Sequence, residues 1–196
     1  MLIAPSVLAA CMIGLELFYS SYQVVTGMPA ASPVIAQDCQ TNTEPTQQDI
    51  DYSLAFTKDA FQKSPWQRSY TVQGGSTDVA WRNDPESAAA ELKYYIWNCG
   101  YSQADLDYAF SDEQLKDVIF KYYQNLQAVS VCSTPKGDLT LREFTADFSN
   151  APFHILFWDK LDKSTRILTV ALIFPQASKT INQYAQAIFP ELPACP

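Results

Sequence analysis

Residues 166–174 read RILTVALIF, and the last eight of them are apolar except for Thr169. Successive side chains of a β-strand point to opposite faces of the sheet. A strand that is apolar in both directions therefore buries both of its faces, which is typical of a central strand. We expect this stretch to lie in the middle of a sheet that is covered on each side.

Three further strands are predicted immediately before it, at residues 128–132, 138–148 and 153–158. Turn-forming sequences separate them: TPKGD precedes the second strand, SNAP precedes the third and DKLDKST follows it. Connections of this length join antiparallel neighbours. The C-terminal half of the chain therefore predicts an antiparallel sheet.

An earlier hairpin is predicted in RSYTVQGGSTDVAW, residues 68–81. Apolar and polar residues alternate on both sides of Gly74 and Gly75. Two glycines supply the positive φ angles that a tight hairpin turn requires. This segment therefore adds two strands.

The segment NDPESAAAELKYYIWNCG, residues 83–100, carries the signals of a helix. Asp84 is placed as an N-cap, Pro85 as the first helical residue and Gly100 as a left-handed C-terminal stop. Apolar residues at helical spacing predict one buried stripe, which consists of Ala89, Leu92, Ile96 and Cys99. We expect a helix here.

Three other segments are predicted to be helical, namely residues 47–63, 111–126 and 178–189. The second of them opens with a capping box formed by Ser111 and Gln114. The order of strands, helices, strands and a last helix predicts an α+β fold, with helices packed on an antiparallel β-sheet in a single domain.

Composition excludes one class of partner. The chain is 47% hydrophobic and 17% charged, as in an ordinary globular protein, and its formal net charge is -8. Its Lys and Arg residues are scattered singly, so no basic face is available to neutralise a phosphate backbone. We expect no nucleic-acid partner.

The N-terminal region resembles a targeting segment. No Lys or Arg occurs in the first 57 residues, and residues 2–15 are uncharged and largely apolar. This run is short for a membrane span and suits the apolar part of a secretory signal. We expect residues 1–36 to be a signal peptide or membrane anchor, residues 37–48 a flexible linker and residues 49–196 the globular domain.

Two processing sites compete within that segment. Small residues near Ala36 favour cleavage with a mature start near Gln37. The alternative is a lipoprotein cleavage box, LAAC, which would place a lipid on Cys11. Both predict a secreted or extracytoplasmic domain that contacts a membrane only through its N-terminus.

Four cysteines remain after the segment, and an even number outside the cytosol suggests two disulfides. They are Cys39, Cys99, Cys132 and Cys195. Three pairings are open, of which we favour Cys99 with Cys132 and Cys39 with Cys195, because the second bond would fasten both loose ends. No two of them have C-x-x-C spacing, so we expect no metal site.

His154 is the only histidine, within FHILFW on a predicted strand whose two faces are both largely apolar. A structural role is favoured there. Catalysis would need a nucleophile and an acid, and Glu143 and Asp147 are the nearest acids expected. Motifs for a serine elbow, a phosphate loop, dinucleotide binding or haem attachment are absent from the sequence, so no cofactor is expected.

Aromatic residues are the remaining unusual feature. Tyr94 and Trp97 cannot share the buried stripe of the predicted helix. Tyr101 follows the end of that helix, and Tyr123 lies on the next predicted helix. Tyrosine and tryptophan combine a large apolar face with a polar group, which suits interfaces. These four residues are the predicted interaction surface.

The sequence favours an exported or cell-surface domain that acts by binding an unknown protein or glycan and is not an enzyme. Two alternatives stay open. One is a secreted hydrolase that uses carboxylates of the C-terminal sheet, and the other is a structural component of a bacterial envelope assembly.

Overall fold

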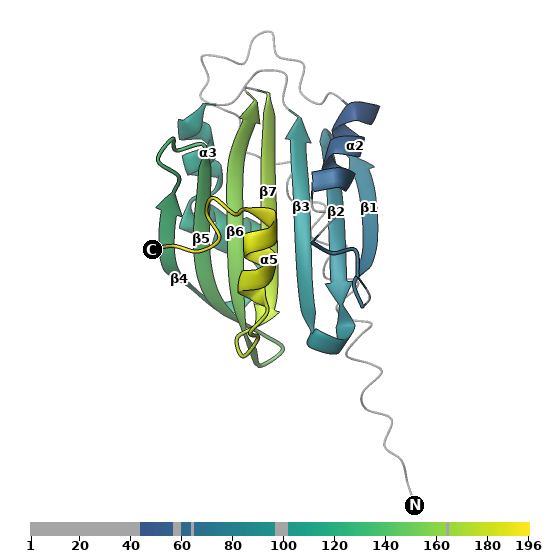
Figure 1. Ribbon diagram of the computed structural model, residues 1–196. Coiled ribbons are helices and arrows are strands. Elements are labelled where there is room, and N and C mark those ends of the chain that lie inside the picture. Colours follow the sequence, from purple (N-terminus) through teal and green to yellow (C-terminus); the bar gives the residue numbers. More distant parts are fainter. Residues whose placement is uncertain (1–43, 57–59, 64, 97–101, 164) are drawn as a thin grey trace, which may run out of the picture.

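The computed structural model describes residues 44–56, 60–63, 65–96, 102–163 and 165–196. In these ranges the chain forms one seven-stranded sheet with the strand order β1-β2-β3-β7-β6-β5-β4 (Figure 1). Every neighbouring pair of strands is antiparallel. The predicted α+β class, with helices on an antiparallel sheet, is confirmed. The predicted N-terminal signal or anchor lies outside the described residues.

The strands are β1 Gln67–Gln73, β2 Ser76–Asn83, β3 Ala88–Ile96, β4 Gln124–Ser133, β5 Leu139–Phe148, β6 Ala151–Lys163 and β7 Arg166–Pro175. The helical elements are α2 Gln47–Phe56, the 3-10 turn η3 Asp84–Glu86, α3 Gln103–Ala109, α4 Asp112–Gln114, the π-helix η4 Leu115–Ile119 and α5 Ile181–Ile188.

Strand β7 is the central strand, as its apolar sequence predicts. It has three strands on each side, and eight of its ten residues are buried. Its two faces belong to different core clusters: Leu172 packs in one and Ile173 in the other. The sheet therefore has a packed layer on both sides.

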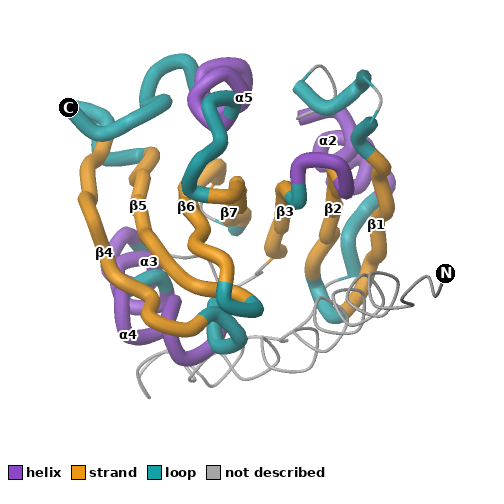
Figure 2. The backbone as a smooth tube through the Cα atoms, turned by 90° about the horizontal axis from the view of Figure 1, so that it is seen from below, coloured by secondary structure: helices purple, strands orange, loops and turns teal. Residues whose placement is uncertain are grey.

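Two layers of helices cover the sheet (Figure 2). Helices α2 and α5 lie on one side, where the C-terminal residues 189–196 also cross the sheet; we call this the α5 face. Helices α3 and α4, together with η4, lie on the other side, which we call the α3 face.

The helix predicted over residues 83–100 is wrong, because residues 88–96 form strand β3. The helix signals produce only one short turn. Asn83, not Asp84, is the N-cap and accepts a hydrogen bond from the backbone of Glu86, and the 3-10 turn η3 follows. Ser87 then takes a left-handed φ of 52° and ends the turn. Beyond it, Leu92 and its alternate neighbours are buried, and β3 pairs with β7 along its length.

The helix predicted over residues 111–126 is confirmed only at its start. Ser111 accepts a hydrogen bond from the backbone of Gln114, but the helical segment ends at Ile119 and strand β4 begins at Gln124. The reciprocal capping box occurs one element earlier, between Ser102 and Asp105.

The predicted N-terminal hairpin is confirmed. Gln73 pairs with Ser76, and the two residues between them, Gly74 and Gly75, have φ angles of 56° and 84°. Residues with side chains adopt such angles only at a cost, so this pair of glycines fixes the register of β1 against β2.

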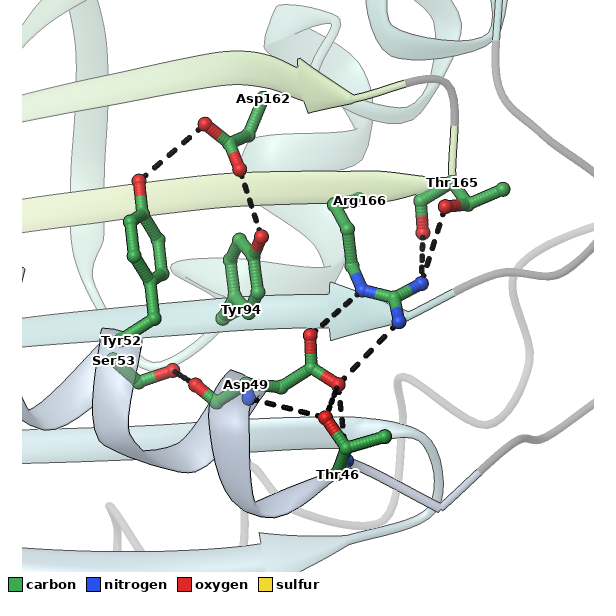
Figure 3. A network of polar contacts seen from close by, with 8 residues as sticks. All are labelled: Thr46, Asp49, Tyr52, Ser53, Tyr94, Asp162, Thr165 and Arg166. Carbon is green, nitrogen blue, oxygen red and sulfur yellow. Dashed lines mark hydrogen bonds and ion pairs between the residues drawn. The ribbon is translucent and has the colours of Figure 1, made fainter.

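A polar network fixes α2 to the α5 face (Figure 3). Asp49 of α2 accepts a hydrogen bond from Nε of Arg166 at 2.9 Å. Asp162 of β6 accepts from the hydroxyls of Tyr52, at 3.4 Å, and Tyr94, at 2.8 Å. Strands β3, β6 and β7 thus all contribute to the network, directly beneath the helix.

The predicted disulfide pairing is wrong, because Cys132 is bonded to Cys195 with a Cα–Cα distance of 5.6 Å. The C-terminal segment crosses the α5 face and reaches β4. Along the way Trp158 donates a hydrogen bond to the carbonyl of Leu192. This route brings the last cysteine to the far edge of the sheet. Two other candidates, residues 39 and 99, lie outside the described residues.

Candidate functional site

A cleft lies on the α3 face, between the sheet and the segment of residues 118–123. Its floor comes from β3, β6 and β7. The cleft has a volume of about 50 Å³ and is open to solvent. The cleft is lined by Glu91, Lys93, Tyr95, Val118, Ile119, Phe120, Tyr122, Tyr123, Phe148, Phe157, Thr169, Ala171 and Ile173.

Strand periodicity places the polar residues of the floor. In β3, Leu92 and Tyr94 pack in the core of the α5 face, so Glu91, Lys93 and Tyr95 point to the α3 face. Lys93 stands opposite Thr169 of β7 in the ladder. A charged pair thereby lies in a cleft whose other lining residues are mostly apolar.

Glu91 and Lys93 form an ion pair with 3.3 Å between Oε1 and Nζ. Their side chains are 24% and 15% exposed. Burial alone would lower the pKa of Lys93, but the attraction of Glu91 and smaller contributions from its other neighbours outweigh burial and raise it. Lys93 is therefore protonated at neutral pH, with Glu91 beside it and Asp78 among its other acidic neighbours.

Two tyrosines add polar groups that stay uncharged. Burial raises the pKa of Tyr95 to about 12. Burial, with the nearby carboxylate of Glu91, also raises the pKa of Tyr123. Both phenols keep their protons at physiological pH, so they add hydrogen-bonding groups without charge.

The wall opposite the floor is formed by a π-helix and the turn after it. The backbone N–H of Phe120 donates to the carbonyl of Leu115 at 2.7 Å, a bond that spans five residues. Phe120 then packs edge-on against Phe157 of the floor. Short π-helical turns are often found at functional sites. Here the turn presents Val118 and Ile119 to the cleft.

A row of polar residues crosses the sheet from the cleft. Asp78, Lys93, Thr169, Asp159 and Thr140 are successive partners across five neighbouring strands. Four of the five residues are buried, and Lys93 is nearly so. Buried polar groups are costly unless they are paired. The row is therefore a specific feature of this face of the sheet.

Beyond the cleft, Asp159 of this row, on β6, forms a buried ion pair with Arg142 of β5. Asp159 is 2% exposed. Burial, the largest influence, raises the pKa of Asp159 to about 6 although Arg142 opposes the shift, and Asp107 of α3 raises it further. The pair thus lies between the sheet and α3.

This raised pKa predicts a pH dependence of stability. Between the ordinary value of 3.8 and about 6, the folded protein retains a proton on Asp159 that the unfolded chain releases. The free energy of unfolding should therefore fall as pH rises through this window, by on the order of 2 kcal/mol. Urea denaturation of the wild type and of Asp159→Asn at several pH values isolates the effect. Parallel profiles for the two proteins would contradict it.

Of the four residues predicted as an interaction surface, the two that the structure describes, Tyr94 and Tyr123, lie on opposite faces of the sheet. Tyr94 is 2% exposed and donates to Asp162, because residues 88–96 are a strand whose alternate side chains enter the core. Tyr123 lies in the cleft on the opposite face of the sheet. Trp97 and Tyr101 lie outside the described residues.

His154 lies on β6, and the two acids predicted near it, Glu143 and Asp147, lie on the neighbouring strand β5. Nε2 of His154 is 3.8 Å from Oε2 of Glu143. The other oxygen of Glu143 accepts a hydrogen bond from the backbone of Cys195. Asp147 accepts from the side chain of Asn125. Both carboxylates therefore fasten neighbouring segments, which is a structural use.

Sequence analysis missed Glu91, Lys93 and Thr169 as site residues. The first two were assigned to a helix, and Thr169 was counted as part of an apolar strand. The available signal was AELKYYI, in which charged and apolar residues alternate as in a strand with one polar face.

Comparison with known proteins yields no relative: no protein-family model, curated protein or solved structure matches this chain. Within the described ranges, no three His, Cys, Asp or Glu side chains gather as metal ligands would. In the same part of the chain, no helix has both the length and the apolar character needed to cross a bilayer.

Proposed function

We propose that this protein is an exported, non-catalytic binding domain, and that the cleft on the α3 face takes a small, uncharged, largely apolar molecule. The observation that carries the proposal is the composition of the cleft: ten of its thirteen lining residues are aromatic or aliphatic, and its ion pair has no net charge. Ligand sites are typically concave and mostly apolar, with a few polar groups that fix orientation.

The size of the cleft restricts the shape of the ligand. A cavity that accepts benzene has a volume of about 150 Å³, whereas the volume of the cleft is about 50 Å³. A narrow group such as the end of an alkyl chain fits this space better than a ring does. The remainder of the ligand would extend toward solvent past partly exposed lining residues such as Phe148 and Tyr122.

The charge of the ligand follows from the ion pair. A charged group in the cleft would lose its hydration, and Lys93 is already matched by the carboxylate of Glu91 and also lies in the field of Asp78. Burying an unpaired charge costs far more than burying a neutral polar group. An uncharged head group is therefore preferred over either an anionic or a cationic one.

The disulfide supports an exported location. Disulfides persist in oxidising compartments and are rare in the cytosol, and Cys132 and Cys195 are bonded. The N-terminal sequence is consistent with secretion or tethering, as argued above.

The proposal is tested with three ligands that share one chain: 1-octanol, octanoate and octylammonium. Titration calorimetry of the full-length protein should show the tightest binding for 1-octanol. Ala171→Phe, which fills the cleft floor between β3 and β6, should weaken 1-octanol binding about tenfold or more, because tenfold equals the burial of about two CH₂ groups.

Ala146→Phe is the matched control. Ala146 is also a buried alanine in the core of the α3 face, but it does not line the cleft. Both Ala→Phe substitutions overpack the core of the α3 face. Ala146→Phe should nevertheless leave the affinity for 1-octanol within about twofold of that of the wild type. Equal binding of the three ligands, or equal effects of the two variants, would contradict the proposal.

A further inference from the structure

Strand β1 is an open edge of the sheet. In the part of the chain that the structure describes, β2 is its single neighbour. Six of its seven residues are exposed, including Tyr70 at 53% and Val72 at 37%. Natural proteins commonly protect such edges with proline, lysine, bulges or a covering segment. QRSYTVQ contains no proline or lysine, and its register with β2 is unbroken.

The hairpin determines which backbone groups point outward. A two-residue turn closes with a hydrogen-bonded pair, here Gln73 with Ser76. Hydrogen-bonded and outward-facing residues then alternate along an antiparallel edge. The outward N–H and C=O groups of β1 therefore belong to Arg68, Tyr70 and Val72.

These three residues are symmetric about the middle of the strand. Tyr70 is the central residue of β1, with Arg68 and Val72 two positions away on either side. An antiparallel copy of the same strand would place Tyr70 opposite Tyr70 and Arg68 opposite Val72 at both ends. Each residue carries one N–H and one C=O, so about six hydrogen bonds would form.

We propose that β1 pairs with β1 of a second copy of this chain, so that a twofold axis passes beside Tyr70 and the two sheets become continuous. The interface is isologous, the commonest type in symmetric dimers. This pairing does not involve the cleft or its ligand. The partner is a second copy of the chain because the edge of β1 is complementary to itself.

The side chains fit this register. Arg68, Tyr70 and Val72 share one face of the sheet, because their partners in β2 alternate in the same way. The two Tyr70 rings would form a cross-strand aromatic pair. The two Arg68 side chains would be four residues apart, about 13 Å at 3.3 Å per residue, and beyond the Debye length of about 8 Å at physiological salt.

The opposite edge of the sheet is less suited to the same pairing. Strand β4 exposes Val129 and Val131, but its register with β5 shifts twice. Such irregularities bend an edge and interrupt its row of hydrogen-bonding groups. The β4 edge therefore serves as an internal control.

Charge variants at Val72 test the register by sedimentation equilibrium of the full chain over a wide concentration range. In the proposed dimer, Val72→Glu places a carboxylate opposite Arg68, and Val72→Lys places a like charge there. Two such contacts form per dimer, so Val72→Glu should strengthen and Val72→Lys should weaken dimerisation by about 3- to 30-fold each.

Repulsion between two molecules of net charge -8 would produce the opposite order, since Val72→Glu adds negative charge. Val131→Glu and Val131→Lys, on the β4 edge, measure that general effect and should show only it. Tyr70→Pro removes an outward N–H and should abolish the dimer. A wild-type monomer at all concentrations, species larger than a dimer, or the opposite order at Val72 would overturn the proposal.

Discussion

Arg142→Met is expected to lower the free energy of unfolding by about 3–5 kcal/mol at neutral pH. The substitution replaces the charged side chain with an apolar one of similar length. It leaves the carboxylate of Asp159, which is 2% exposed between the sheet and α3, without its partner. Removal of one member of a buried ion pair is far more costly than removal of both. Urea denaturation followed by tryptophan fluorescence gives the change directly.

The double variant Arg142→Met/Asp159→Leu is the control for this prediction. With both charges replaced by apolar side chains, most of the lost stability should return, and the interaction energy from the full cycle should be large. If the two single substitutions and the double one were additive, Arg142 and Asp159 would not act as a pair. The ion pair that Asp159 of the polar row forms with Arg142 would then contribute no coupling energy.

Replacing both Cys132 and Cys195 with alanine is expected to destabilise the protein by about 4 kcal/mol. The bond closes a loop of sequence separation 63, and closure of a loop of this length removes much of the entropy of the unfolded chain. It also anchors the C-terminal segment, which supplies Leu192 to the core and a carbonyl to Trp158.

Thermal unfolding of the oxidised wild type and the double-alanine variant measures this loss. A reductant should lower the midpoint of the wild type toward that of the variant and leave the variant itself nearly unchanged. An equal response of both proteins to reductant would show that a different bond carries the effect.

The sheet could be predicted because its signals are local. Residues 166–174 are apolar in both directions, and the short turns around β5 and β6 permit only antiparallel neighbours. The glycine pair likewise fixes the first hairpin without help from the rest of the chain. In each case the sequence of one segment is sufficient to determine its structure.

Strand β3 could not be predicted in the same way because two signals compete within a few residues. Pro85 and the acidic residues beside it favour a helical start, and three alanines favour its continuation. The long-range pairing of β3 with β7 outweighs these local preferences. Intrinsic helix propensity is a weak prior that tertiary contacts override.

The cleft depends on the same long-range pairing. Glu91 and Lys93 reach Thr169 only because β3 lies beside β7, more than 70 positions along the chain. With β3 taken as a helix, the charged residues appear to be ordinary surface charges. The disulfide was missed for a related reason, since the path of the C-terminal segment across the α5 face is set by the core beneath it.

The most direct test of the binding proposal is a ¹H–¹⁵N correlation spectrum of the full-length protein titrated with 1-octanol. Amide shifts should change in β3 around Lys93, in β7 around Thr169 and in residues 118–123, and they should saturate together. Changes confined to the α5 face, or none at concentrations where 1-octanol remains dissolved, would contradict the assignment of the cleft as the binding site.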